Sequence, residues 1–325
     1  MAFAEKGREL VNRWKLLIKS QVLVAFLVAV GLFLVGQVIS SGFGSFSNVM
    51  NILSLSSFLG IIALGQTLVI LSGGEGIDLS LGAIISLSAV VASQLLNGND
   101  VSLAWVVPLG VAMGLVLGLA NGVGVSYFKI PPLIMTLAMA SVIQGIALIY
   151  TDGQPKGMAS PLLITVGTQR TAEIPNILFV WIVVTVFALF LLRKTSWGLR
   201  LYGMGENNLT AELSGIRTRV LRTWVYGVNG AVAAFGGILL LGYTSTSYLD
   251  IGSAYVMPSV AAVVIGGVSL AGGVGSYLGT AIGAVILTTL GSILIALKMG
   301  EAGRQVVYGA MLLLLLILYA RQTKK

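Results

Sequence analysis

The chain has 325 residues, of which 57% are hydrophobic and only 9% are charged. A soluble domain carries about 25% charged residues, so this composition, with a mean hydropathy of +0.99, indicates an integral membrane protein. Cysteine and histidine are both absent, which excludes disulfides, thiolate and histidine metal sites and Ser-His-Asp catalysis. We therefore expect no catalytic residue, no metal and no cofactor.

Apolar runs long enough to cross a ~30 Å hydrocarbon core as helices recur along almost the whole chain. These runs are apolar on every side and do not alternate between apolar and polar residues, which favours helices over a β-barrel. The sequence predicts an all-α polytopic membrane protein with about ten crossings in a single domain, residues 1–325. The expected crossings are 21–39, 51–71, 83–96, 103–125, 133–150, 177–192, 221–243, two within 257–297, and 306–320.

The net charge of +8 comes largely from three basic segments, residues 1–20, 193–222 and 321–325. Each flanks an apolar run, a pattern typical of membrane topology and not of nucleic-acid binding. The positive-inside bias places all three in the cytoplasm, and a count of ten crossings puts them on the same face. Both termini and the loop 193–220 are therefore predicted to be cytoplasmic, with residues 1–20 forming either an interfacial helix or a solvated tail.

The segment Ser72–Gly82 interrupts the apolar pattern with glycines and two carboxylates, Glu75 and Asp78. Carboxylates are costly in hydrocarbon and normally face a cavity, a partner or water. One interpretation places both at the cytoplasmic mouth of a translocation path or gate, or in a contact that braces the chain against a partner. The other is that Asp78 caps a helix beginning at Leu79, its carboxylate accepting from the amides of Ser80 and Leu81, and the two interpretations can hold together.

Four polar residues lie within the spans: Gln66, Asn121, Gln144 and Asn229. Their side chains can line a route for a hydroxyl-rich solute, or they can hold helices together by hydrogen bonds. We assign Gln66 and Asn229 to the candidate path or gate. Buried charge is otherwise scarce, whereas an ion-coupled secondary transporter usually carries intramembrane ionisable residues. The energy for transport is therefore expected to come from outside this chain.

The loop 193–220 contains the features of one short helix. Asn207 or Asn208 can cap it, Leu209–Ser214 can form it, and Gly215 suits the left-handed residue that ends it. The apolar side chains of this segment are Leu209, Leu213 and Ile216. They need either a groove on a partner or the membrane headgroups as a support.

Two glycine-rich segments resemble each other: ILSGGEGIDLSLGAIISL, starting at Ile70, and VIGGVSLAGGVGSYLGTAIGAVIL, starting at Val264. Transporters are often built from internal repeats, and this likeness predicts one here. Glycine is also common in membrane helices because it permits close packing, so both interpretations stay open.

The segment GMGENNLTAELSGI, Gly203–Ile216, resembles the Gly-x-Asn-x-x-Ala-Ala-x-x-Ser-Gly-Ile loop of the permease subunits of bacterial ABC importers. The branch concerned contains the ribose, xylose, galactose and autoinducer-2 permeases. Leu209 and Thr210 replace the usual Glu-Ala of that loop, which removes an acidic contact. Three further blocks are similar to the same family: Gly76–Gly82, Lys129–Met139 and Ala261–Thr280.

This resemblance implies a permease subunit of the bacterial plasma (inner) membrane that forms the pathway for a small polar solute, most simply a monosaccharide. It implies four kinds of partner: an ABC ATPase subunit with two ATPase domains per complex, a second permease copy or paralogue, an extracytoplasmic solute-binding protein, and membrane lipid. The ATPase-coupling residues that it implies are Asn207, Asn208, Leu209, Ala211, Leu213, Ser214 and Gly215. The chain has no Gly-x-x-x-x-Gly-Lys-Ser/Thr phosphate loop, so it is not expected to hydrolyse ATP itself. The alternatives are an ion-coupled secondary transporter and a channel-like protein.

Overall fold

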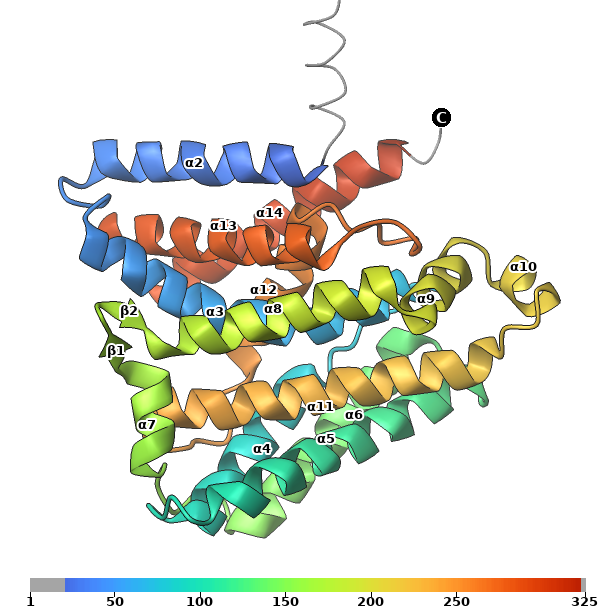
Figure 1. Cartoon of the computed structure of the whole chain (residues 1–325), viewed down its shortest axis with the longest axis horizontal. Coiled ribbons are helices and arrows are strands. Elements are labelled where there is room, and N and C mark those ends of the chain that lie inside the picture. Colours follow the sequence, from blue (N-terminus) through green and yellow to red (C-terminus); the bar gives the residue numbers. More distant parts are fainter. Residues whose placement is uncertain (1–20, 323–325) are drawn as a thin grey trace, which may run out of the picture.

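A computed structural model describes residues 21–322 of the chain and is almost entirely helical (Figure 1). The predicted N-terminal segment 1–20 and residues 323–325 of the predicted tail lie outside the described residues. The elements are α2 (Gln21–Ile39), α3 (Phe46–Leu71), α4 (Leu81–Leu96), α5 (Leu103–Ser126), α6 (Pro132–Thr151), α7 (Pro161–Thr168), β1 (Arg170–Thr171), β2 (Ile174–Pro175), α8 (Asn176–Lys194), α9 (Ser196–Glu206), α10 (Asn208–Leu213), α11 (Thr218–Thr244), α12 (Ser253–Ile265), α13 (Tyr277–Ala296) and α14 (Glu301–Gln322).

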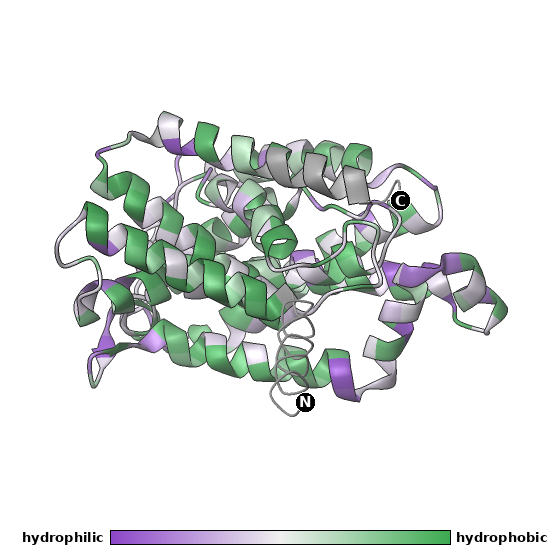
Figure 2. Ribbon diagram, turned by 90° about the horizontal axis from the view of Figure 1, so that it is seen from above, coloured by the Kyte–Doolittle hydropathy of each residue, from purple (hydrophilic) through white to green (hydrophobic). Residues whose placement is uncertain are grey.

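Within residues 21–322, seven helices are long and apolar enough to cross a membrane: α2, α3, α5, α6, α8, α11 and α13. Hydrophobic residues cover the lengths of the helices, and hydrophilic residues gather mainly at the two ends of the bundle (Figure 2). The helices α4 and α12 are apolar but have only 16 and 13 residues, about 24 and 20 Å of helix against a ~30 Å core. The chain is thus a polytopic membrane protein in which two apolar helices are too short to span alone.

The centre of the bundle is formed by α3 and α11, which are mostly buried, whereas α2, α5, α6 and α8 expose most of their surface. The packing of α5 on α11 depends on small residues spaced one turn apart. A Cβ atom added at Gly114 would strike the carbonyl oxygen of Gly230, and one added at Gly118 would strike that of Tyr226. These glycines let the two backbones touch, the arrangement by which membrane helices associate most closely.

Four short elements were not predicted from the sequence. The segment between the fifth and sixth predicted crossings contains the helix α7, which Ser160 caps, and the antiparallel strands β1 and β2. The loop 193–220 contains a further helix, α9, which Thr195 caps by accepting from the amide of Gly198. Short capped helices of this kind leave no apolar periodicity long enough to be recognised.

Candidate functional site

A buried polar cluster lies where the loop between α3 and α4 meets α11. The Asp78 side chain is 1% exposed. Its Oδ1 accepts from the amide of Ser80 at 2.8 Å and from the Ser80 hydroxyl at 2.6 Å, and its Oδ2 accepts from Asn229 Nδ2 at 2.7 Å. The carboxylate is thereby held by its own loop on one side and by α11 on the other.

Two more of the polar span residues join this cluster. The Gln66 side-chain amide is placed in the orientation in which both its oxygen and its nitrogen form hydrogen bonds with the Asp78 backbone. The oxygen accepts from the Asp78 N–H at 3.2 Å, and the nitrogen donates to the Asp78 carbonyl at 3.3 Å. Asn121 Nδ2 donates to the Ser80 hydroxyl at 2.7 Å. By contrast, Gln144 is exposed on α6. The cluster therefore connects α3, α5 and α11 through the loop between α3 and α4.

The capping prediction for Asp78 is right in its bond to Ser80 and wrong in the start of the helix. The helix α4 begins at Leu81, not Leu79, and its N-cap residue is Ser80. Asp78 accepts from the Ser80 amide and forms a turn just before the helix. The two glycines at Gly73 and Gly74, with φ of +73° and +67°, turn the chain back into the bundle ahead of it.

Asp78 lies well inside the bundle. Its partner Asn229 is about 16 Å along α11 from the first residue of that helix, Thr218, at 1.5 Å per residue. Glu75 is exposed and adopts a positive φ of +56°, and it takes no part in the cluster. The two carboxylates are therefore in different environments, with Glu75 exposed at the turn and Asp78 buried in the bundle.

Three buried polar atoms around Asp78 have no hydrogen-bond partner among residues 21–322: Asn121 Oδ1, Asn229 Oδ1 and the Tyr226 hydroxyl. A buried polar group without a partner costs roughly 1–3 kcal/mol. The cluster thus stores unused hydrogen-bonding capacity near the middle of the bundle. That property suits a part of the molecule that changes its bonding partners.

The loop 193–220 forms the second candidate site, and α10 projects from it beyond the end of the bundle (Figure 1). Asn207 caps this helix by accepting from the Thr210 amide at 3.0 Å. At its end the Ser214 hydroxyl donates to the Thr210 carbonyl at 2.9 Å, and Gly215 takes the left-handed φ of +83°. The predicted cap and terminator are confirmed.

The side chains of α10 face in two directions. Ala211 is buried, whereas Leu209 is 66% and Leu213 is 82% exposed. Ile216 packs instead against the core of the bundle, so only two of the three predicted apolar side chains project. Two exposed leucines on a two-turn helix form a small apolar surface that water covers poorly.

Hydrogen bonds tie α10 to the spans. The Glu212 carboxylate accepts from the Thr218 hydroxyl at 2.5 Å and from Asn208 Nδ2 at 3.1 Å, and these two bonds lower the pKa of Glu212. Arg222 Nη2 donates to Asn208 Oδ1 at 3.3 Å and lies 3.5 Å from the Ser72 carbonyl oxygen. Arg222 thereby connects the short helix with the loop that carries Asp78. From the sequence, Arg222 was interpreted only as part of a basic segment that marks membrane topology.

A second connection consists of backbone packed against backbone. A Cβ atom added at Gly205, at the end of α9, would strike the carbonyl oxygen of Leu71 and the amide of Gly273. Gly273 N in turn donates to the Leu71 carbonyl at 3.1 Å, and Tyr202 of α9 donates to the Gly275 carbonyl at 2.9 Å. The end of α9 therefore touches both glycine-rich loops, α3–α4 and α12–α13. We call this contact of Gly205, Leu71 and Gly273 the glycine junction.

Comparison with known proteins identifies the family. Residues 48–316 match the model of the permease component of the branched-chain amino acid transport system. The chain is 32% identical to the ribose import permease protein of Escherichia coli K12 over 302 residues, 92% of each chain. It is 36% identical to the ribose import permease protein of Bacillus subtilis over 274 residues, 83% of this chain and 84% of the relative.

A relative named for a different solute is similarly close. The autoinducer 2 import system permease protein of Escherichia coli K12 is 32% identical over 308 residues, 92% of this chain and 86% of the relative. No solved structure shows significant similarity to the chain. The matched region runs from the third residue of α3 through α13 and contains both glycine-rich loops and the whole of α10. The chain belongs to the permease components of ABC importers, in the branch of the ribose and autoinducer-2 permeases, and is a multi-pass protein of the inner membrane.

Proposed function

We propose that this permease imports a monosaccharide. As the permease component of a binding-protein-dependent importer it forms the transport pathway and is not itself an enzyme. Relatives that act on ribose and on autoinducer 2 support a small, hydroxyl-rich solute. Asp78, in the loop between α3 and α4, is the one buried carboxylate within residues 21–322, and its three hydrogen bonds hold it inside the cluster. This arrangement favours an external energy source over the ion-coupled alternative.

The proposed energy source is an ABC ATPase subunit, with two ATPase domains per complex, that docks on α10. One observation carries this proposal: α10 is a capped helix outside the bundle that exposes Leu209 and Leu213. An amphipathic helix that lays its apolar side chains in a groove is a common mode of protein recognition. The docking surface consists of Asn207, Asn208, Leu209, Leu213, Ser214 and Gly215, and the buried Ala211 holds it to the bundle.

The proposed transmission route runs from α10 to the buried cluster by two connections. Arg222 joins Asn208 to the loop between α3 and α4, and the glycine junction joins α9 to both glycine-rich loops. A displacement of α10 would therefore move the loop that carries Asp78. Gln66, Asp78 and Asn229 act in this scheme as a gate that holds the inner part of the path, and Glu75 lies in water at its mouth.

The proposed topology has ten crossings with both termini in the cytoplasm. Seven long apolar helices, the short α4 and α12, and the partly described α14 supply the ten segments. In each proposed half of an internal repeat, an apolar helix, a glycine-rich loop and a second apolar helix follow one another: α3–α4 and α12–α13. A second permease copy or a paralogue would complete the pathway, and an extracytoplasmic solute-binding protein would deliver the sugar.

Reconstitution tests this proposal. The permease is placed in proteoliposomes with its ATPase subunit and binding protein, and uptake of labelled ribose and of a hexose is measured. We expect uptake that requires ATP and the binding protein and that is insensitive to ionophores. Uptake driven by a proton or sodium gradient without the ATPase would support the secondary transporter instead.

A further inference from the structure

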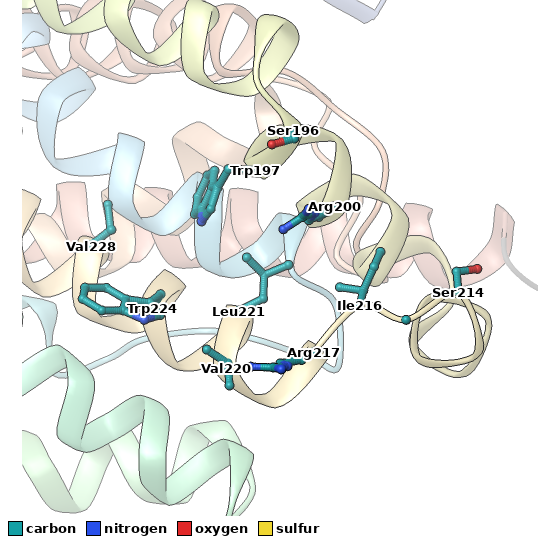
Figure 3. A pocket seen from close by; sticks show the side chains of 11 residues that line it. Ser196, Trp197, Arg200, Ser214, Ile216, Arg217, Val220, Leu221, Trp224 and Val228 are labelled. Carbon is teal, nitrogen blue, oxygen red and sulfur yellow. The ribbon is translucent and has the colours of Figure 1, made fainter.

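A cavity of about 720 Å³ lies between α9 and the first turns of α11 (Figure 3). Its walls include two arginines, Arg200 and Arg217, and two tryptophans, Trp197 and Trp224, but no Asp or Glu. Trp224 is 49% exposed, so the cavity opens at the side of the bundle. A cationic cavity with no lining carboxylate is complementary to an anion.

The cavity is cationic at one end and apolar at the other. Leu221, Trp224 and Val228 of α11 line it, together with Arg217, the N-cap residue of that helix. These four residues are three or four positions apart. They extend over about 16 Å of helix axis at 1.5 Å per residue. Figure 3 shows the arginines toward the α10 end, Val228 and Trp224 at the opposite end and Trp197 between them. A ligand that fills this space needs an anionic end and an apolar end.

We propose that this cavity binds one anionic phospholipid. The lipid phosphate lies between Arg200 and Arg217, because guanidinium groups bind phosphate through paired hydrogen bonds. The first part of an acyl chain lies along Leu221 and Val228. Trp197 and Trp224 occupy the boundary between headgroup and chain, where tryptophan is enriched in membrane proteins. Basic pockets between membrane helices on the cytoplasmic side are suited to such headgroups.

Other occupants account for less of the cavity. A free phosphate ion would use the two arginines but leave the apolar end at Val228 without a role. A protein docked on α10 from the aqueous side could reach Arg217, but Val228 lies three turns further along α11. The lipid alone uses both ends, and it would link α9 to α11 directly beside the α10–α11 turn. This inference does not depend on which solute is carried.

The first test uses the unaltered chain. Delipidated permease in neutral detergent is titrated with phosphatidylglycerol, phosphatidylcholine or inorganic phosphate, while the unfolding temperature is recorded and retained lipid is counted by native mass spectrometry. We expect phosphatidylglycerol alone to raise the unfolding temperature and to remain bound at one molecule per chain. Equal protection by phosphatidylcholine, or by inorganic phosphate, would overturn the proposal in favour of an apolar groove or a soluble-anion site.

The second test uses variants. R200Q/R217Q should weaken phosphatidylglycerol binding by about fivefold for each arginine removed. The matched control is K129Q, which removes an exposed lysine of the α5–α6 turn at the same end of the bundle, outside the cavity. V228W fills the apolar end without a charge change and should also reduce lipid retention. If K129Q loses as much binding as R200Q/R217Q, or if V228W keeps full binding, the cavity is not the lipid site.

Discussion

Asn229 of α11 donates a hydrogen bond of 2.7 Å to Oδ2 of Asp78, although the two residues are 151 positions apart in the chain. The acceptor belongs to a loop that enters the bundle between α3 and α4, and the donor belongs to the central helix α11. The carboxylate is buried, so this bond replaces hydration that the group has lost. The packing of the loop against α11 therefore depends on a polar contact within an apolar core.

Replacing Asn229 with leucine should destabilise the permease. The change leaves Asp78 Oδ2 buried without its donor, which costs roughly 1–3 kcal/mol. Thermal unfolding in detergent measures the loss. The control is Gln144→Leu, which removes an amide from an exposed position of a span and should leave the unfolding temperature unchanged. Equal effects of the two substitutions on the unfolding temperature would mean that the Asp78 cluster does not stabilise the permease more than an exposed amide does.

The glycine junction predicts that alanine substitutions at two glycines of α9 have different effects on stability and uptake. A Cβ atom at Gly205 meets the backbone of Leu71 and Gly273, whereas one at Gly203 meets nothing within 4 Å. Gly205→Ala should therefore force the loops apart at a cost of roughly 1–3 kcal/mol and reduce ATP-dependent uptake. Gly203→Ala should preserve both stability and uptake. Normal transport by the Gly205 variant would remove the junction from the proposed route.

The contact between α5 and α11 predicts that alanine substitutions at two other glycines differ in their effect on stability. Gly118 faces the backbone of Tyr226 on α11, and Gly145 of α6 has open space around it. Gly118→Ala should lower the unfolding temperature because two packed backbones must separate. Gly145→Ala should be neutral or slightly stabilising, since alanine favours a helix by up to about 1 kcal/mol over glycine. The prediction fails if the two variants unfold at the same temperature.

Glu212 predicts a pH dependence of the α10–α11 connection. Hydrogen bonds from Thr218 and Asn208 lower its pKa, so the folded state favours the charged carboxylate. The resulting stabilisation is present above the ordinary pKa of a glutamate and is lost as the pH falls through the lowered value. Hydrogen exchange in residues 208–216, corrected for its intrinsic pH dependence, should rise on acidification. Glu212→Gln should abolish that dependence, and an unchanged profile in this variant would assign it to another group.

Much of the helical framework could be predicted from hydropathy alone, because the long apolar runs have no other stable conformation in lipid. The cap at Asn207 and the left-handed Gly215 were also predictable, since each depends on neighbours within a few residues. The pairing of Asp78 with Asn229 was not, although both residues were recognised as polar within apolar surroundings. Such a contact depends on how the helices are arranged, which a single sequence does not record.

The different environments of Glu75 and Asp78 were likewise not predictable from the sequence. Both are carboxylates of one short segment, yet Asp78 is buried in the bundle and Glu75 is exposed. Glu75 belongs to the turn that begins at Gly73 and Gly74 and has a φ of +56°, whereas Asp78 follows this turn. The conformation of the turn depends on contacts with Arg222 and the glycine junction. Arg222 was itself counted only as a topology signal, because its partners Asn208 and Ser72 are brought to it by the fold.

The central claim is that α10 transmits ATP-driven motion, and uptake by Leu213→Arg tests it most directly. Leu213 is 82% exposed, so the substitution should leave the fold intact while it places a charge in the proposed docking surface. Loss of an apolar anchor of this kind costs about 2 kcal/mol or more, so ATPase binding and ATP-dependent sugar uptake in proteoliposomes should fall by more than about tenfold. Leu199→Arg, at an exposed leucine of α9, should transport normally. Full ATP-dependent uptake by the Leu213 variant would contradict the account.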